Sequence, residues 1–239
     1  MKKILISTGG SGGHVIPATI FYDHFKSQFD VKLVSDKRGK DYIDEKKYNF
    51  DIIDAPKPLK NILFSPFFII FFFLSIFKSL IFLKTHKINY LISTGGYMSL
   101  PFCIAAKIIN LNIFLFEPNM VLGRSNKFVL GFSTKIFCYH KDIINFPKKF
   151  KNKITLIDRL LRKDSYYIGK NKTKEISKNF KILVIGGSQG ASFFDDEIKK
   201  VIEKLSKIKK IFLLQQINNE IKKKEIEKIY KNLEINYEL

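Results

Sequence analysis

The stretch Lys2-Lys3-Ile4-Leu5-Ile6-Ser7-Thr8-Gly9-Gly10-Ser11-Gly12-Gly13-His14 decides the fold, because an apolar run ends there in a glycine loop. The Ile and Leu residues predict a buried parallel strand. The glycines predict a tight turn that brings backbone N–H groups close to a ligand, and a helix expected to begin near Pro17 adds the positive end of its dipole. This combination is typical of a cradle for phosphate or diphosphate. A strand-to-helix turn that binds nothing is the plainer alternative.

The pattern of an apolar strand that ends in two glycines occurs three times. It returns in Ile92-Ser93-Thr94-Gly95-Gly96-Tyr97-Met98-Ser99 and in Ile182-Leu183-Val184-Ile185-Gly186-Gly187-Ser188-Gln189-Gly190-Ala191. The third copy also repeats the Lys-Ile-Leu start of the first, which indicates an internal duplication of a strand-loop-helix unit. Three such loops favour ligand binding over plain turns.

Strand and helix patterns alternate along the chain. We expect strands at residues 31–36, 50–54, 88–94, 113–116, 135–139 and 211–214, and helices at 17–29, 100–109 and 123–130. This alternation predicts an α/β architecture of doubly wound parallel sheets, with ligands at the carboxyl ends of the strands. The expected domains are an N-terminal domain at 1–165, a linker at 166–180 and a second domain beginning at 181–239. Because a doubly wound domain normally needs about 100 residues or more, the second domain is expected to be incomplete.

The composition indicates a globular protein with an anionic partner. The formal net charge is +20, and 46% of the residues are apolar, which is ample for a core. The charge fits nucleic acid, a phospholipid surface or a phosphorylated substrate. A compositional bias that spreads Lys over the surface is the plain alternative. Since the Phe residues are clustered and not interleaved with Lys, we expect no nucleic-acid partner.

The sequence offers little for a metal or a disulfide. Cys103 and Cys138 stand 35 positions apart among apolar residues, and the sequence has no Cys-x-x-Cys pair, His-rich cluster or Asp-x-Asp signature. We therefore expect no metal site, no disulfide and no cofactor. The apolar run after Met1 is too short for the core of a signal peptide, so the protein is expected to stay inside the cell.

Residues 62–83, ILFSPFFIIFFFLSIFKSLIFL, are long and apolar enough to span a bilayer. However, they lie between strands of one expected sheet, whose halves a spanning helix would separate. We predict a helix partly buried on the sheet, with an exposed Phe-rich patch that dips into the bilayer interface. The predicted membrane patch comprises Phe67, Phe68, Phe71, Phe72 and Lys78. A fully buried core helix is the alternative.

Four motifs occur in a specific order and spacing, namely TGGSGGHVIPA, STGGYMSLP, FEPNMVLGRSNK and VIGGSQGAS. Together they resemble the MurG family of bacterial peptidoglycan N-acetylglucosaminyltransferases over essentially the whole chain. The resemblance implies a GT-B fold, in which two Rossmann-like domains face a cleft, and peripheral attachment to the cytoplasmic face of the inner membrane. Members of that family run on for roughly another domain's worth of chain.

The resemblance also implies a reaction. N-acetylglucosamine is transferred from UDP-N-acetylglucosamine to the muramyl 4-hydroxyl of undecaprenyl-diphosphate-MurNAc-pentapeptide, with inversion, which converts lipid I to lipid II. The partners are thus the UDP sugar, the undecaprenyl-diphosphate-linked acceptor and the cytoplasmic membrane surface. Without a metal signature, the departing nucleoside diphosphate must be met by helix N-termini and cations.

An inverting transfer needs a base for the attacking hydroxyl. His14 follows the first loop and is the candidate base or sugar-orienting residue. The expected donor-binding residues are Ser11, Gly12, Gly13, Asn119, Arg162, Ser188 and Gln189. The first loop also suits the acceptor diphosphate, and the expected acceptor loops contain Gly95, Gly96, Tyr97, Ser99 and Glu117. Glu117 is expected to orient Asn119 or His14.

Two other functions stay open at this level. A short second domain is compatible with a non-catalytic homologue that binds membrane and a polyprenyl-diphosphate acceptor. Asp36 ends a strand about 23 residues after Gly13, where dinucleotide-binding oxidoreductases carry a ribose-binding acid. However, Val15 stands in place of the third glycine of G-x-G-x-x-G, so the oxidoreductase is the weaker alternative.

Overall fold

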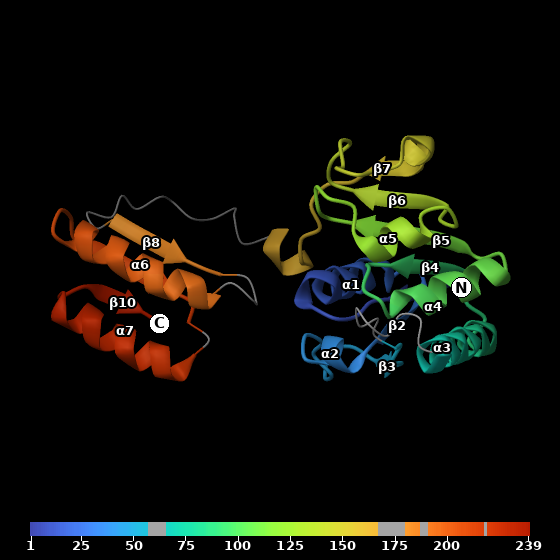
Figure 1. Cartoon of the computed structure of the whole chain (residues 1–239), viewed down its shortest axis with the longest axis horizontal. Coiled ribbons are helices and arrows are strands. Elements are labelled where there is room, and N and C mark those ends of the chain that lie inside the picture. Colours follow the sequence, from blue (N-terminus) through green and yellow to red (C-terminus); the bar gives the residue numbers. More distant parts are fainter. Residues whose placement is uncertain (57–65, 167–179, 187–190, 218) are drawn as a thin grey trace. The chain divides into compact units, whose positions relative to one another are not determined.

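The computed structural model describes residues 1–56, 66–166, 180–186, 191–217 and 219–239 (Figure 1). The chain divides into two compact units, Met1–Lys170 and Asn171–Leu239. Each unit combines a parallel sheet with helices, so the predicted α/β class is confirmed.

The first unit is built on a seven-stranded parallel sheet with the order β3-β2-β1-β4-β5-β6-β7. Its strands are β1 (Lys3–Ser7), β2 (Asp30–Ser35), β3 (Phe50–Ile52), β4 (Tyr90–Ser93), β5 (Asn112–Glu117), β6 (Lys135–Cys138) and β7 (Ile154–Leu156). The order reverses at β1, because β2 lies on one side of it and β4 on the other. In such sheets ligands bind at this reversal, outside the carboxyl ends of the strands.

Both faces of this sheet are covered, because successive strand residues point to opposite sides. Ile4 and Ile6 pack with α1 (Gly12–Phe25) on one face, and Leu5 joins the core under α4 (Ser99–Ile108) and α5 (Arg124–Val129) on the other. The shorter segments are α2 (Lys37–Lys40) and the 3-10 turns η1 (Lys148–Lys153) and η2 (Lys163–Tyr166). The carboxyl ends of the central strands therefore lie between two helical layers.

The first helix starts earlier than the sequence pattern indicates, at Gly12 instead of near Pro17, and it ends at Phe25 instead of Phe29. Pro17 lies in the second turn, where it removes one helical hydrogen bond but does not stop the helix. At the other end, the backbone N–H of Phe29 donates to Phe25 O at 3.0 Å in a closing turn. As a consequence, Gly12 and Gly13 belong to the first turn of a helix.

Strand β7 is not predicted by the sequence pattern, because it has three residues and lies in a Lys-rich stretch. The neighbouring Lys153 explains how this stretch is held. Its ammonium group donates to the carbonyl oxygens of Leu130 and Gly131, both at 3.0 Å, and to that of Ser133. These carbonyls lie in the turn after α5, so the cation ties the segment before β7 to that turn.

Helix α3 (Pro66–Thr85) packs chiefly along α4, with Phe82 in edge contact with Phe102. Leu83 of α3 also joins the core that contains the strand residues Leu5 and Leu91, so the helix is partly buried, as expected. Its inward face carries Ser75 and Ser79, which are 7% and 0% exposed. Only 17% of the most apolar 18-residue stretch of this helix is buried, so the alternative of a fully buried core helix is wrong. By length and composition, it is the one described helix that meets the requirement for crossing a membrane.

The second unit contains β8 (Phe180–Val184), α6 (Ala191–Ser206), β9 (Ile211–Gln215), α7 (Glu220–Asn232) and β10 (Asn236–Glu238). Its three described strands form a parallel sheet in the order β10-β9-β8. The core contains a polar chain, in which the buried Tyr230 hydroxyl donates to Gln215 Oε1 at 2.8 Å and Gln215 Nε2 donates to Asp195 Oδ1 at 3.2 Å. These bonds satisfy polar groups that burial would otherwise penalise.

Candidate functional site

The loops after β1 and β4 interlock at the reversal of the strand order. A Cβ at Gly96 would lie 2.6 Å from Gly9 O, and a Cβ at Gly95 would lie 2.8 Å from His14 Nδ1. Gly10, Gly95 and Gly96 also have positive φ angles of 89°, 102° and 86°. Two of the predicted glycine loops thus form one continuous surface, which only glycine permits at these positions.

His14 is fixed across this junction. It lies in the first turn of α1, and its Nδ1 stands 2.9 Å from Thr94 O, the carbonyl that follows β4. A carbonyl oxygen only accepts hydrogen bonds, so Nδ1 carries the proton in this contact. In the neutral ring Nε2 is then the basic nitrogen. The candidate base is therefore held in one tautomer by the neighbouring loop.

The N-terminus of α1 leaves backbone N–H groups open. Ser11 is the N-cap, but its side chain makes no capping hydrogen bond, and the first turn contains no acidic residue. Within the described ranges, the N–H groups of Gly12 and Gly13 have no hydrogen-bond acceptor. Gly13 is exposed and Gly12 is buried against Tyr42. Open N–H groups at the positive end of a helix dipole suit a phosphate group.

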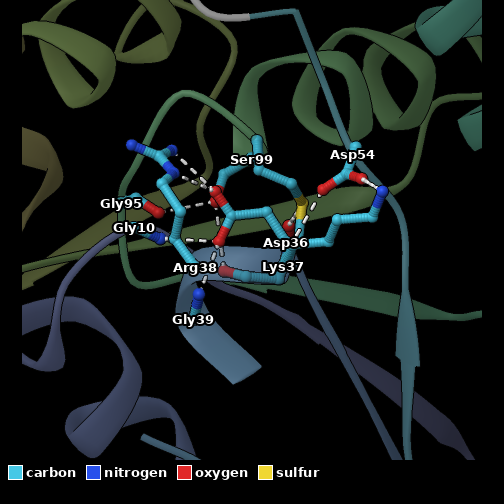
Figure 2. Close-up of polar contacts among 10 residues, drawn as sticks. Gly10, Asp36, Lys37, Arg38, Gly39, Asp54, Gly95 and Ser99 are labelled. Atoms are coloured by element: carbon cyan, nitrogen blue, oxygen red, sulfur yellow. Dashed lines mark hydrogen bonds and ion pairs between the residues drawn. The ribbon is translucent and has the colours of Figure 1, made fainter. Parts of the chain in front are cut away.

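Asp36 holds the first glycine loop through hydrogen bonds (Figure 2). Its Oδ1 accepts from the N–H groups of Gly10 at 2.9 Å and Gly39 at 2.8 Å, and its Oδ2 accepts from Arg38 Nε at 3.0 Å and Nη2 at 2.6 Å. Burial alone would raise the pKa of this carboxyl, but these hydrogen bonds outweigh it and hold the pKa below its usual value. With its oxygens engaged, Asp36 supports the loop and does not serve as a ribose-binding acid.

Glu117 organises the loop after β5. Its Oε1 accepts from Asn119 Nδ2 at 2.9 Å, and its Oε2 accepts from Gly123 N at 2.7 Å and Asn126 Nδ2 at 3.0 Å. Glu117 is 2% exposed, while Asn119 is exposed. Of the two expected partners of Glu117, the structure brings Asn119 to it, and His14 bonds to Thr94 O instead. Burial, with the nearby Glu117 carboxylate, raises the pKa of Cys138 to about 12.

Asn126 belongs to the same network and is not singled out by the sequence pattern. It is 4% exposed, donates to Phe116 O at 3.0 Å as well as to Glu117, and leaves its own Oδ1 without a partner among the described residues. It lies inside the third motif, so the motif locates the region. The role of Asn126 depends on how α5 packs on β5, which no local pattern encodes.

Two residues of the expected acceptor loop, Ser99 and Tyr97, differ in how accessible their side chains are to a ligand. Ser99 is 1% exposed, and its hydroxyl lies 2.8 Å from Gly95 O and 3.2 Å from Ser7 O. It therefore holds the loop together and does not present a hydroxyl to a ligand, which corrects its expected role. Tyr97 is half-buried on the same loop.

The remaining donor-binding candidates are not gathered at this junction. Arg162 is exposed and follows Leu161, whose carbonyl oxygen lies 3.3 Å from His24 Nε2 near the C-terminal end of α1. His14 lies in the first turn of the same helix. Ser188 and Gln189 lie outside the described residues.

The predicted membrane patch lies on α3. Phe67 and Phe71 are 71% and 57% exposed, and Lys78 is exposed. Phe68 and Phe72 are half-buried and stack on each other with ring centroids 6.0 Å apart. The exposed surface extends beyond the predicted residues to Ile70, Phe73, Leu74, Phe77 and Ile81. Such a continuous apolar strip marks an interaction surface.

Comparison with known sequences gives consistent matches. A family model described as the glycosyltransferase family 28 N-terminal domain matches residues 4–138. A relative from Pelagibacter ubique is 51% identical over 238 residues, covering 100% of this chain and 66% of the relative. One from Rickettsia canadensis is 33% identical, with 100% of this chain and 68% of the relative covered. Both are named UDP-N-acetylglucosamine–N-acetylmuramyl-(pentapeptide) pyrophosphoryl-undecaprenol N-acetylglucosamine transferase. The chain thus spans about two thirds of their length.

Solved structures agree on the fold. MurG from Acinetobacter baumannii matches with a TM-score of 0.73 and 19% identity, covering 99% of this chain and 66% of that protein. A UDP-GlcNAc 2-epimerase from Neisseria meningitidis, bound to UDP-GlcNAc, matches with a TM-score of 0.60 and 14% identity, covering 99% and 71%. These matches confirm the predicted GT-B type of fold.

Proposed function

Because the chain belongs to the MurG family within glycosyltransferase family 28, we propose that it serves the transfer of N-acetylglucosamine from UDP-N-acetylglucosamine to an undecaprenyl-diphosphate-linked acceptor. The acceptor group is the muramyl 4-hydroxyl, and the configuration at the sugar C1 inverts. The product is the lipid-linked disaccharide used in peptidoglycan synthesis.

The contact between His14 Nδ1 and Thr94 O at 2.9 Å carries this proposal. It leaves Nε2 as the proton acceptor on a ring that cannot turn freely. As the acceptor oxygen bonds to C1 of N-acetylglucosamine, Nε2 takes the hydroxyl proton. The bond between C1 and the diphosphate oxygen breaks, and its electron pair leaves with UDP. A positioned base of this kind contributes about 10²–10⁴-fold to a rate.

The first unit supplies the acceptor side of the site in this proposal. The open N–H groups of Gly12 and Gly13 bind an acceptor phosphate, helped by the dipole of α1. Asn119, held by Glu117, hydrogen-bonds to a sugar. The UDP diphosphate is assigned to the third glycine loop with Ser188 and Gln189, and to Arg162.

The exposed strip of α3 supports peripheral attachment to the cytoplasmic face of the membrane. It combines large apolar side chains with the exposed cations Lys78 and Lys84, which suit anionic head groups. Attachment there brings the acceptor loops, which are linked to α3 through α4, near the lipid that carries the substrate.

A transfer assay tests the proposal. The 239-residue chain in detergent is given labelled UDP-N-acetylglucosamine and a short-chain analogue of the lipid-linked acceptor, alongside His14→Asn. The asparagine retains an amide donor near the position of Nδ1 but provides no base, so transfer is expected to fall at least 100-fold while the fold persists. Equal rates in the two proteins would refute the role of His14.

A second candidate function is acceptor binding without transfer. It is favoured by the placement of His14, the loops after β1, β4 and β5, and the strip on α3 within one compact unit. In that case the folded chain would be retained by liposomes that carry the acceptor lipid and show no turnover. Failure of such liposomes to retain the protein would exclude this function.

A further inference from the structure

Arg38 is held next to Gly10 of the first glycine loop, although it belongs to no motif of the sequence. Its guanidinium group donates twice to Asp36 Oδ2, and its Nη2 would lie 3.8 Å from a Cβ at Gly10. Figure 2 shows the side chain lying along this loop. The side chain is 47% exposed, so the cation is held in place and still faces solvent.

The ion pair between Arg38 and Asp36 leaves some N–H groups of Arg38 without an acceptor among the described residues. A guanidinium has five N–H groups in a planar fork, and two of them go to Asp36. Within the described part of the chain, Asp36 is the only acceptor that Arg38 reaches. The Asp36 side chain is 7% exposed, and its carboxylate also accepts from Gly10 and Gly39. The solvent-facing member of the pair is therefore the cation, and its free N–H groups are the ones that an anion would meet.

Two buried hydroxyl groups at the same junction also lack partners. Thr8 and Thr94 are 0% and 1% exposed, and neither Oγ1 has a hydrogen-bond partner in the described ranges. They are neighbours, because each follows the last residue of one of two paired strands, β1 and β4, and Thr94 N donates to Ser7 O at 3.1 Å. By strand alternation they follow Ile6 and Ile92 onto the face that α1 covers. Buried hydroxyls are normally satisfied, so these two Oγ1 atoms beneath the first turn of α1 keep hydrogen-bonding capacity that the described residues do not use.

We propose that Arg38 binds one phosphate of the diphosphate-linked acceptor, while the N–H groups of Gly12 and Gly13 bind the other. The inference rests on the proposed function, which places the acceptor at this loop, and adds to it a residue that selects diphosphate over monophosphate. A planar, pre-oriented fork matches phosphate oxygens. Gly10 and Gly12 are two residues apart, so their Cα atoms are at most about 7 Å apart, and one ligand can reach both parts of the site.

The test compares Arg38→Gln with Lys37→Gln in the full chain. Lys37 is the adjacent cation, with a side chain 80% exposed and paired with Asp54 at 3.4 Å, so both substitutions remove one positive charge from the same short helix. Binding of a soluble short-prenyl diphosphate, a short-prenyl monophosphate and UDP is measured by calorimetry at constant ionic strength. Melting temperatures establish that each variant is folded.

Arg38→Gln is expected to weaken binding of the prenyl diphosphate about 10- to 100-fold, and that of the monophosphate about threefold or less. Lys37→Gln is expected to change either affinity less than threefold, because it lacks the fixed fork. Arg38→Lys, which restores charge without the fork, should recover only part of the loss. Equal effects of Arg38→Gln and Lys37→Gln, a loss for UDP alone, or no binding of the prenyl diphosphate to the unchanged protein would overturn the inference.

These outcomes are separable from failure of the proposed function. If the folded chain binds prenyl diphosphate through Arg38 but transfers no sugar, the binding site stands and the transferase proposal falls. If transfer occurs and Arg38→Gln leaves both diphosphate affinity and the KM for acceptor unchanged, the transferase proposal stands and the role of Arg38 falls.

Discussion

Gly96 lies so close to Gly9 that a Cβ at position 96 would stand 2.6 Å from the carbonyl oxygen of Gly9. With its φ of 86°, Gly96 is also in a conformation that costs about 1–3 kcal/mol for other residues. We expect Gly96→Ala to lower the free energy of unfolding by at least about 2 kcal/mol and to abolish acceptor binding. Gly13→Ala is the matched control, because its Cβ would meet nothing closer than Ser11 Oγ at 3.7 Å. Denaturant unfolding measures the stability of the two variants. Equal losses of unfolding free energy in Gly96→Ala and Gly13→Ala would contradict the close packing of the two loops.

Glu117→Gln should damage the loop after β5. The carboxylate accepts from four N–H groups, and an amide would turn a donor toward one of the donors it now meets. The expected loss is about 1–3 kcal/mol of unfolding free energy, together with weaker acceptor binding. Asn119→Ala separates the two effects, since Asn119 is exposed and its loss should change stability by no more than about 0.5 kcal/mol. Equal stability of Glu117→Gln and the unchanged protein would rule out this network.

Liposome flotation tests the surface of α3. The double variant Phe71→Glu, Phe77→Glu replaces two Phe residues that are 57% and 60% exposed with carboxylates. Binding to vesicles with anionic lipid should fall about tenfold or more, because apolar contact is lost and charge repulsion is added. Ile221→Glu, at an 80% exposed site on α7, is the control and should leave flotation unchanged. Unchanged flotation of the double variant would show that α3 does not contact lipid.

A cluster around Asp23 makes stability depend on pH. Burial alone would raise the pKa of Asp23, but hydrogen bonds from Lys26, Tyr48 and Lys47 outweigh it and lower the pKa to about 2. A carboxyl with a depressed pKa stabilises the fold above its unfolded value, near 4, and this contribution is lost as the pH falls toward 2.

We therefore expect Asp23→Asn to cost about 1–2 kcal/mol at pH 7 and almost nothing at pH 2. Asp142→Asn, at an exposed position, should cost less than about 0.5 kcal/mol at either pH. Denaturant titrations at several pH values measure the difference. A cost for Asp23→Asn that is independent of pH would mean that its side chain acts through packing and not through charge.

The sequence predicts the parts of the fold that depend on local patterns. The apolar runs that end in Gly-Gly predict β1, β4 and their loops, and the spacing of the motifs places His14 beside them. What it misses depends on contacts between distant residues. Asp36 looks like a ligand-binding acid in sequence, but its carboxylate accepts from Arg38 in the adjacent helix α2 and from Gly10, which lies 26 residues away in the first glycine loop. No local pattern shows that a carboxylate is already fully engaged.

The same limit explains the correction to Ser99 and the packing of α3 along α4. Ser99 looks like an available hydroxyl until β1 brings Ser7 O within 3.2 Å of it. Residues 62–83 predict an apolar helix with an exposed patch, but composition alone does not reveal that the two serines face inward against α4. Pro17 misplaces the start of α1, because a proline is tolerated in the second turn as well as in the first.

The meeting of Thr94 with Ser7 has a consequence for how the protein acquires its site. The N–H of Thr94 reaches Ser7 O across more than 80 residues of intervening chain, which include α1, β2, β3 and α3. Contacts of such long sequence separation form slowly, because the chain loses the entropy of loop closure before the contacts stabilise the fold. A nascent chain that has emerged only as far as α3 has the first glycine loop but nothing to set the His14 tautomer. The contact that sets the His14 tautomer therefore forms only after β4 has paired with β1.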